Sequence, residues 1–381
     1  MELSIYGRTR LRSVDLPLRP DLVGTEPYGA PQLDVPVLLN VNENPYPPPA
    51  QVISDIAESV ARAAQGMNRY PDRDFEALRA DLATYLAKES GADELRVPNI
   101  WAANGSNEVM LHVLQAFGGP GRTVLSFAPT YSMYPEYARD TLTQYVAGER
   151  EAGFALSADA ALAKIRQVRP AVVLLASPNN PTGTALDLAT IEQIAAGTTD
   201  TGPDGAATVV VIDEAYAEFR RSETSSALSI RPRYRHLAVA RTMSKAFAGA
   251  GIRLGYLAAD PAVVDALRVV RLPYHLSAIT QAVARAALRH TDALQAQVAE
   301  LRTRRDETVA WLREQGYRVA ATDANFVLFG MFDDRHHIWQ GLLDRGVLIR
   351  ETGPAGYLRV SIGTAEEMAA FRGALKEVTA A

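Results

Sequence analysis

Cysteine is absent from this 381-residue chain, and lysine is rare, with four lysines against 35 arginines. Without cysteine the protein can form no disulfide, bind no iron–sulfur cluster through thiolates and perform no thiol catalysis. The six histidines show none of the spacings typical of a metal site, so we expect no bound metal.

Long apolar runs are also missing, since no stretch approaches the roughly eighteen residues of a membrane span. The first residues have neither the basic start nor the apolar centre of a signal peptide. A formal net charge of -5, with scattered arginines, gives no electrostatic reason to expect nucleic acid or an anionic membrane as partner. With 48% hydrophobic and 22% charged residues the composition is ordinary for a globular protein, and we expect a cytoplasmic enzyme.

The scarcity of lysine draws attention to Lys245. The other three, Lys88, Lys164 and Lys376, lie in amphipathic helical patterns, as solvated surface lysines do. Lys245 instead lies among small and apolar residues in the segment 241–255. An amine can lose its charge on burial and attack a carbonyl, whereas a guanidinium stays protonated. We therefore predict that Lys245 is a covalent anchor that forms a Schiff base.

Three apolar runs of strand length, at 171–176, 208–212 and 236–241, alternate with helical patterns. Each run ends in a polar cluster. Uninterrupted apolar strands are typical of a parallel sheet that is covered on both faces. The sequence thus predicts an α/β fold with a large, doubly wound, mainly parallel sheet and a site at its carboxyl edge.

The chain divides into three predicted parts. Residues 1–50 lack helical periodicity and form an extended arm that contributes to a smaller domain. Residues 51–278 form the large domain. Residues 279–381 supply an interdomain helix, expected to be continuous over about 280–312, and then the short strands and helices of a smaller α+β domain.

Polar residues at three consecutive strand ends are predicted to face one ligand, because neighbouring parallel strands end at the same edge of a sheet. They are Asn180, Asp213, Tyr216, Lys245 and Arg253. The chemistry that needs them together is that of pyridoxal 5′-phosphate (PLP). Lys245 would hold PLP, and Asp213 would keep its pyridine nitrogen protonated. Asn180 and Tyr216 would donate hydrogen bonds to its phenolic oxygen.

Further residues are predicted to bind the PLP phosphate and ring. A strand, a small-residue turn and a helix start bring free N–H groups together at Ser106 and Asn107. The loop around Lys245 would add Thr242, Ser244 and Arg253, and Tyr131 could stack on the ring.

Each cluster also has an ordinary structural interpretation. Polar residues at a helix start can serve only as its N-cap, and an Asp-Glu pair that follows a strand can do the same for the next helix. The Pro-Asn-Asn-Pro-Thr-Gly segment can be only a turn. The glycines of 249–255 do not match a dinucleotide fingerprint, because the last spacing is one residue too long and no acidic residue follows about twenty positions on. The case for PLP rests on the four clusters occurring together.

These segments resemble a known family. Asn-Pro-Thr-Gly at 180–183, Asp-Glu-Ala-Tyr at 213–216 and Ser-Lys-Ala-Phe…Gly-x-Arg-x-Gly at 244–255 are similar to the fold-type I, PLP-dependent aminotransferases. Glu-Pro-Tyr at 26–28, Leu-Asn-Val-Asn-Glu-Asn-Pro at 39–45 and further segments most resemble the subfamily that acts on histidinol phosphate.

The resemblance implies a homodimer with two sites at the subunit boundary, where Tyr70 of one subunit reaches the PLP phosphate of the other. It also implies substrate contacts from Tyr28, on an arm that closes over the substrate, and from Asn44. Arg359 matches the anion-binding arginine of the family, and Arg350 matches a second one near the far end of the substrate.

The implied reaction, a step of histidine biosynthesis, converts L-histidinol phosphate and 2-oxoglutarate to imidazole-acetol phosphate and L-glutamate. An aromatic amino acid aminotransferase, or a phosphothreonine decarboxylase-like enzyme, would share the same PLP residues and stays an alternative. A regulator that uses such a domain as a ligand sensor would need a DNA-binding module, and the sequence shows no basic helix for one.

Overall fold

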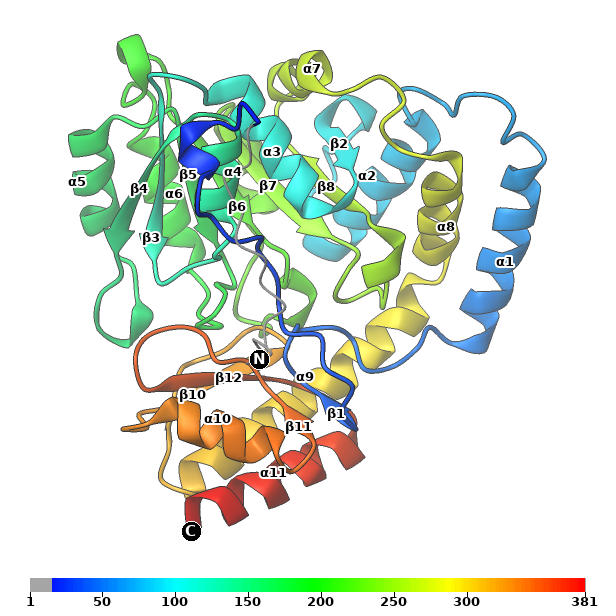
Figure 1. Cartoon of the computed structure of the whole chain (residues 1–381). Coiled ribbons are helices and arrows are strands. Elements are labelled where there is room, and N and C mark those ends of the chain that lie inside the picture. Colours follow the sequence, from blue (N-terminus) through cyan, green and yellow to red (C-terminus); the bar gives the residue numbers. More distant parts are fainter. Residues whose placement is uncertain (1–15, 381) are drawn as a thin grey trace.

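The computed structural model describes residues 16–380, and its larger part is a seven-stranded sheet in the order β2-β8-β7-β6-β5-β3-β4 (Figure 1). β8 runs antiparallel to both of its neighbours, and all other adjacent strands are parallel. The strands are β2 (Ile100–Ala103), β3 (Thr123–Ala128), β4 (Gln144–Glu149), β5 (Val172–Ala176), β6 (Val209–Asp213), β7 (Leu237–Thr242) and β8 (Gly255–Ala258).

Helices lie on both faces of this sheet (Figure 1). They are α2 (Glu76–Ser90), α3 (Gly105–Phe117), α4 (Tyr134–Asp140), α5 (Ala158–Val168), α6 (Leu188–Ala196) and α7 (Pro261–Val270). β5, β6 and β7 are buried at every position, which explains their continuous apolar sequences. The predicted large, mainly parallel sheet is therefore present.

The smaller domain contains a three-stranded antiparallel sheet of β12 (Tyr357–Ser361), β10 (Phe326–Gly330) and β9 (Arg318–Val319). Its helices α10 (Arg335–Leu343) and α11 (Ala365–Ala380) lie at the bottom of the view in Figure 1. The described part of the predicted arm joins this domain, since β1 (Val37–Leu38) pairs in parallel with β11 (Val347–Leu348). Residues 1–15 of the arm lie outside the described part of the chain.

The expected continuous helix over 280–312 is wrong, because the chain forms two helices, α8 (Ala278–Arg289) and α9 (Thr291–Glu314). They are interrupted at His290, whose φ of -109° and ψ of 26° are not helical. Its ring contacts Asp55 of α1 (Ala50–Ala64) at 3.0 Å, and Arg289 donates to the same carboxylate at 2.9 Å. A contact with a remote helix thus ends the first helix where the sequence alone continues its pattern.

No helix between residues 16 and 380 is long and apolar enough to cross a membrane.

Candidate active site

A cavity of about 300 Å³ opens at the carboxyl edge of the large sheet, next to the arm and the smaller domain. It is lined by thirteen predicted site residues: Tyr28, Ser106, Asn107, Tyr131, Asn180, Asp213, Tyr216, Thr242, Ser244, Lys245, Arg253, Arg350 and Arg359. The structure therefore brings together residues from 28 to 359 of the chain, as a site for one ligand requires.

Lys245 follows β7 and extends into this cavity. Its Nζ donates a hydrogen bond to the backbone oxygen of Val41, in the arm, at 3.1 Å. Burial lowers the pKa of Lys245 to about 8, and the positive charges of Arg359 and Arg253 act in the same direction. Part of the Lys245 population is therefore neutral near physiological pH, as a nucleophilic amine or a proton acceptor requires.

Asp213 is the last residue of β6 and is buried. One carboxylate oxygen, Oδ2, accepts a hydrogen bond from Tyr134 Oη at 2.9 Å, and Oδ1 accepts one from the N–H of Ala215 at 3.3 Å. Burial raises the pKa of Asp213 to about 6, and both hydrogen bonds oppose that rise. Among the described residues, no cation forms an ion pair with this carboxylate. It is suited to a cationic ligand group.

Tyr216 lies beside Asp213 in the cavity, and its hydroxyl accepts two hydrogen bonds. Asn42 Nδ2 donates to it at 3.0 Å and Asn180 Nδ2 at 3.5 Å. Because both neighbours are donors, the proton of Tyr216 is free for a further acceptor. The Tyr216 ring packs edge-on against Phe326 of β10, at 5.1 Å between centroids.

Residues at the start of α3 and in the loop after β7 line a further part of the cavity. Gly105, the first residue of α3, has a φ of +83°, which disfavours other residues, and a Cβ there would lie 2.9 Å from Arg253 Nη2, so that the guanidinium would have to shift. This close approach brings Arg253 to the N-terminus of α3, where backbone N–H groups and the helix dipole favour an anion. Thr242 and Ser244 add hydroxyls, joined by a 3.0 Å hydrogen bond. The arrangement suits a phosphate.

Two arginines line the side that the smaller domain forms. Arg359 Nη1 donates to Asn180 Oδ1 at 2.5 Å, and Nη2 donates to the backbone oxygen of Asn40 at 2.8 Å. Its guanidinium lies over the Phe326 ring, and burial lowers its pKa to about 10. Arg359 Nε and Arg350 Nη1 are buried without a hydrogen-bond partner. Both arginines therefore have spare donors for an anionic ligand.

Two aromatic residues cover the cavity. Tyr28 Oη and Ser132 Oγ share a hydrogen bond of 3.0 Å, which fastens the arm to the loop before α4. Tyr131 donates to Asn107 Oδ1 at 3.5 Å.

Two predicted site residues do not line this cavity. Asn44 accepts a hydrogen bond from the N–H of Tyr46 at 3.0 Å, while its own amide nitrogen is buried without a partner. Tyr70 is 80% exposed and stacks on Tyr274 at 4.5 Å between centroids.

Comparison with known proteins identifies the family. Residues 35–375 match the family model "Aminotransferase class I and II". The chain belongs to this aminotransferase family. A histidinol-phosphate aminotransferase of Thermobifida fusca is 58% identical over 377 residues and covers 99% of each chain. Another, from Bifidobacterium adolescentis, is 56% identical over 373 residues and covers 95% of each chain.

Solved structures support the fold. The structure named as a putative histidinol-phosphate aminotransferase from Erwinia carotovora atroseptica has a TM-score of 0.79 at 23% identity, covering 90% of this chain and 96% of that one. That of the histidinol-phosphate aminotransferase from Sinorhizobium meliloti, in complex with pyridoxal-5′-phosphate, has a TM-score of 0.77 at 23% identity and covers 90% of each chain. The predicted fold class and family resemblance are confirmed.

Some cavity residues of this aminotransferase were missed by the sequence reasoning. Asn40 and Asn42 line the cavity, whereas the prediction named Asn44 of the same segment. Asn42 has a left-handed backbone conformation, with a φ of +57°, so the alternation of an extended segment does not hold here and the sequence pattern alone does not separate these positions. Asn42 is fixed by Ser361 of β12, whose Oγ donates to Asn42 Oδ1 at 2.9 Å.

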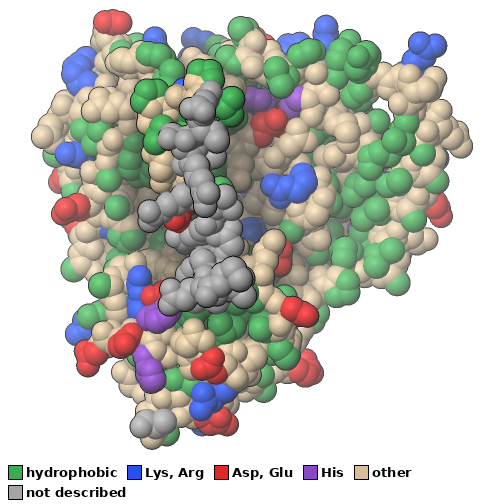
Figure 2. Space-filling model, in the orientation of Figure 1, with side chains coloured by type: hydrophobic (Ala, Val, Ile, Leu, Met, Phe, Trp, Pro, Cys, Tyr) green, Lys and Arg blue, Asp and Glu red, His purple; other side chains and the backbone are tan. Residues whose placement is uncertain are grey.

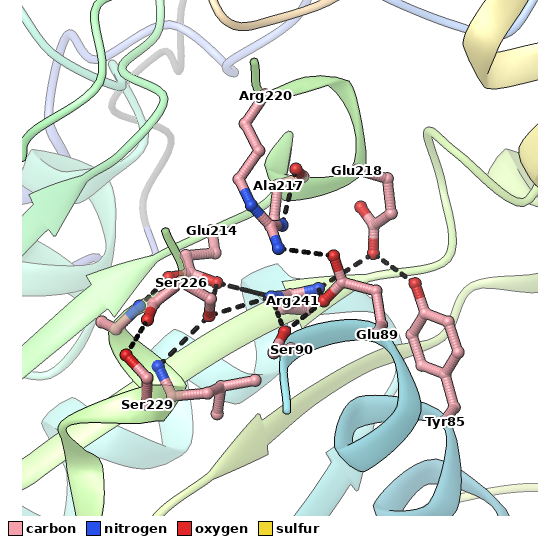
Figure 3. Close-up of polar contacts among 12 residues, drawn as sticks. Tyr85, Glu89, Ser90, Glu214, Ala217, Glu218, Arg220, Ser226, Ser229 and Arg241 are labelled. Atoms are coloured by element: carbon pink, nitrogen blue, oxygen red, sulfur yellow. Dashed lines mark hydrogen bonds and ion pairs between the residues drawn. The ribbon is translucent and has the colours of Figure 1, made fainter. Parts of the chain in front are cut away.

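An ion-pair network centred on Arg241 joins the end of β7 to Glu214, the residue that follows Asp213 (Figure 3). Arg241 of β7 is 1% exposed and contacts three carboxylates: Glu214 at 2.8 Å, Glu89 of α2 at 2.7 Å and Glu218 at 3.3 Å. Charged side chains are buried in this way only when they are paired. The network joins β7 and α2 to the segment that follows β6 and begins next to Asp213.

Proposed function

We propose that this chain is a PLP-dependent aminotransferase that converts L-histidinol phosphate and 2-oxoglutarate to imidazole-acetol phosphate and L-glutamate, a step of histidine biosynthesis. The observation that carries the proposal is the 52–58% identity, over nearly the whole chain, to relatives named histidinol-phosphate aminotransferase. The arginine pair and the Lys245 amine in one cavity give the physical basis.

The residues of the cavity fit PLP. The Asp213 carboxylate accepts hydrogen bonds from Tyr134 and from the N–H of Ala215 but has no cationic partner among the described residues. It can therefore pair with a protonated ring nitrogen. The close approach of Gly105 to Arg253 leaves an anion-binding corner at the start of α3. When bound to an amine substrate, PLP withdraws electrons from the substrate carbon and so makes its proton easier to remove.

Lys245 has two tasks in this proposal. In the resting enzyme its Nζ binds PLP covalently. With Lys245 released from PLP by a substrate amine, the neutral Nζ would accept the proton of the substrate carbon and, once protonated, would serve as the proton donor. The lowered pKa of Lys245, about 8, makes the neutral amine available near physiological pH.

The other residues bind and orient. Asp213 pairs with the ring nitrogen, while Tyr216 and Asn180 contact the phenolic oxygen and Tyr131 stacks on the ring. The phosphate is held by Ser106, Asn107, Thr242, Ser244 and Arg253. All of these residues line the same cavity, which supports the assignments.

We assign substrate binding to residues of the arm and of the smaller domain. Arg350 and Arg359 meet a phosphate in one half-reaction and a carboxylate in the other, because guanidinium groups bind both. Tyr28 covers the substrate from the arm. Asn44 was predicted to contact substrate, but Asn42 is better placed because it lines the cavity.

The proposal includes a homodimer in the cytoplasm, with Tyr70 reaching the PLP phosphate of the other subunit. Tyr70 is exposed, and so are the apolar side chains of Met67, Val269 and Leu272. Figure 2 shows further apolar side chains gathered over the flank formed by α1 and α8. Surfaces of this composition favour association with a second copy.

A specificity assay tests the proposed reaction. The purified full-length protein is supplied with PLP and 2-oxoglutarate, and kcat/KM is compared for histidinol phosphate, phenylalanine and tyrosine. We expect histidinol phosphate to be preferred. A higher kcat/KM for either aromatic amino acid would favour the alternative aminotransferase, and release of carbon dioxide from phosphothreonine would favour a decarboxylase.

A further inference from the structure

Tyr134 is a buried residue that neither the sequence reasoning nor the cavity lining identifies. It is the first residue of α4 and is 0% exposed. Its Oη lies 2.9 Å from Asp213 Oδ2. The ring packs against Tyr131, at 5.7 Å between centroids, and Tyr131 faces the cavity. Tyr134 therefore contacts the Asp213 carboxylate without lining the cavity.

We propose that Tyr134 is a positioning residue, which holds Asp213 ionised and correctly oriented before PLP binds. This inference rests on the proposed function, because it assigns Asp213 to the ring nitrogen of PLP. It adds a residue that contacts neither PLP nor substrate.

The chemistry of the contact supports this role. Burial, and then the negative charge of Asp213, raises the pKa of Tyr134 well above its ordinary value, so the phenol stays protonated and can only donate to the carboxylate. A neutral donor stabilises the negative charge without cancelling it. An arginine or lysine in the same place would neutralise Asp213 and weaken its attraction for a protonated ring nitrogen.

The geometry also restricts rotation of the carboxylate. Tyr134 binds Oδ2 and the N–H of Ala215 binds Oδ1, so the two oxygens are held by different elements. Each oxygen keeps a second acceptor position for the ligand. The other titratable groups that face Asp213 are Tyr131, Tyr137, Tyr216 and the neighbouring Glu214. Glu214 is itself paired with Arg241.

The next turn of α4 offers a matched control. Tyr137 is also buried, at 3% exposed, and its hydroxyl interacts with Tyr131 and makes no hydrogen bond to the Asp213 carboxylate. Tyr134→Phe and Tyr137→Phe thus remove the same atom from the same helix. Only the first change removes a donor from Asp213.

The experiment measures PLP binding to the full-length chain, stripped of cofactor, by visible absorbance across a range of pH. Tyr134→Phe should bind PLP roughly tenfold or more weakly at neutral pH, because a hydrogen bond to a charged group is lost. The acidic side of its binding profile should also move to higher pH. Tyr137→Phe should match the wild type in both respects.

The outcomes are distinguishable. If the wild-type protein does not bind PLP, the proposed function is wrong. If the wild type binds PLP and Tyr134→Phe has the same affinity and pH profile, the inference about Tyr134 alone is wrong. If Tyr134→Phe does not fold, 3-fluorotyrosine at position 134 keeps the hydroxyl and makes it a stronger donor. The acidic side of its profile should then move to lower pH, and an unchanged profile contradicts the proposal.

Discussion

Arg350 and Arg359 lie directly opposite each other, because each backbone N–H donates to the carbonyl oxygen of the other, at 2.9 Å and 3.0 Å. The pairing places two guanidinium groups on one side of the cavity. Like charges at short range repel unless an anion lies between them. We therefore expect this pair to bind the phosphate of one substrate and a carboxylate of the other in turn.

Removing Arg359 should weaken substrate binding strongly. Arg359→Ala should lower kcat/KM for histidinol phosphate by roughly a hundredfold, mainly through KM, because charge-assisted hydrogen bonds are lost. Steady-state kinetics measure this change. The control is Arg345→Ala, which removes an arginine that pairs with Glu377 away from the cavity. An unchanged kcat/KM for Arg359→Ala would show that Arg359 does not bind the anionic group of the substrate.

Asp213 should make the cofactor-free protein less stable as the pH rises. Its pKa in the folded protein is about 6, above the ordinary 3.8, so the folded state holds its proton more tightly than the unfolded state. The free energy of unfolding therefore falls between about pH 4 and pH 6, by about 3 kcal/mol in total. Asp213→Asn should remove this fall and make the cofactor-free protein more stable at neutral pH.

Urea unfolding at several pH values checks this prediction. Asp159→Asn, at an exposed position in α5, is the control and should keep the wild-type dependence. If Asp213→Asn shows the same loss of stability with rising pH as the wild type, burial of the Asp213 charge is not its cause.

The Arg241 network should contribute strongly to stability. Arg241→Met would leave the buried carboxylates of Glu214 and Glu218 without their cation, while Glu89 keeps its pair with Arg220, and the change should cost about 3–5 kcal/mol in the free energy of unfolding. Arg235→Met, which breaks an exposed pair with Asp260, should cost less than about 1 kcal/mol. Chemical denaturation compares the two variants, and equal losses would show that burial of the network adds nothing.

Asn42 and Asn44 should differ in their effect on catalysis. Asn42→Ala removes a 3.0 Å hydrogen bond to Tyr216 and should lower kcat roughly tenfold. Asn44→Ala changes a residue outside the cavity and should leave kcat within about twofold of the wild type. A larger loss of kcat in Asn44→Ala than in Asn42→Ala would show that Asn44, and not Asn42, contacts the substrate.

The sequence predicts those parts of the fold and site that depend on local pattern. Asn180, Asp213 and Lys245 could be placed together because apolar strands in a parallel sheet end at one edge. The break at His290 could not be predicted, because it depends on a contact with Asp55 far away in the sequence. Tyr134 was missed for a similar reason, since only the tertiary fold brings its hydroxyl to Asp213, 79 residues further along the chain.

Resemblance to a family supplied what local pattern could not. Arg350 and Arg359 come from a different domain than Lys245, and no periodicity links them. The prediction for Tyr70 depends on a second subunit and stays a prediction.

The identity of the lysine that binds PLP tests the account most directly. The protein is incubated with PLP and reduced with borohydride, and peptide mapping by mass spectrometry locates the attached cofactor. The chain has only four lysines, so the result is unambiguous. The account predicts that the label lies on Lys245 and is lost in Lys245→Ala. A label on Lys88, Lys164 or Lys376 instead, or a Lys245→Ala variant that still performs transamination at the wild-type rate, would contradict it.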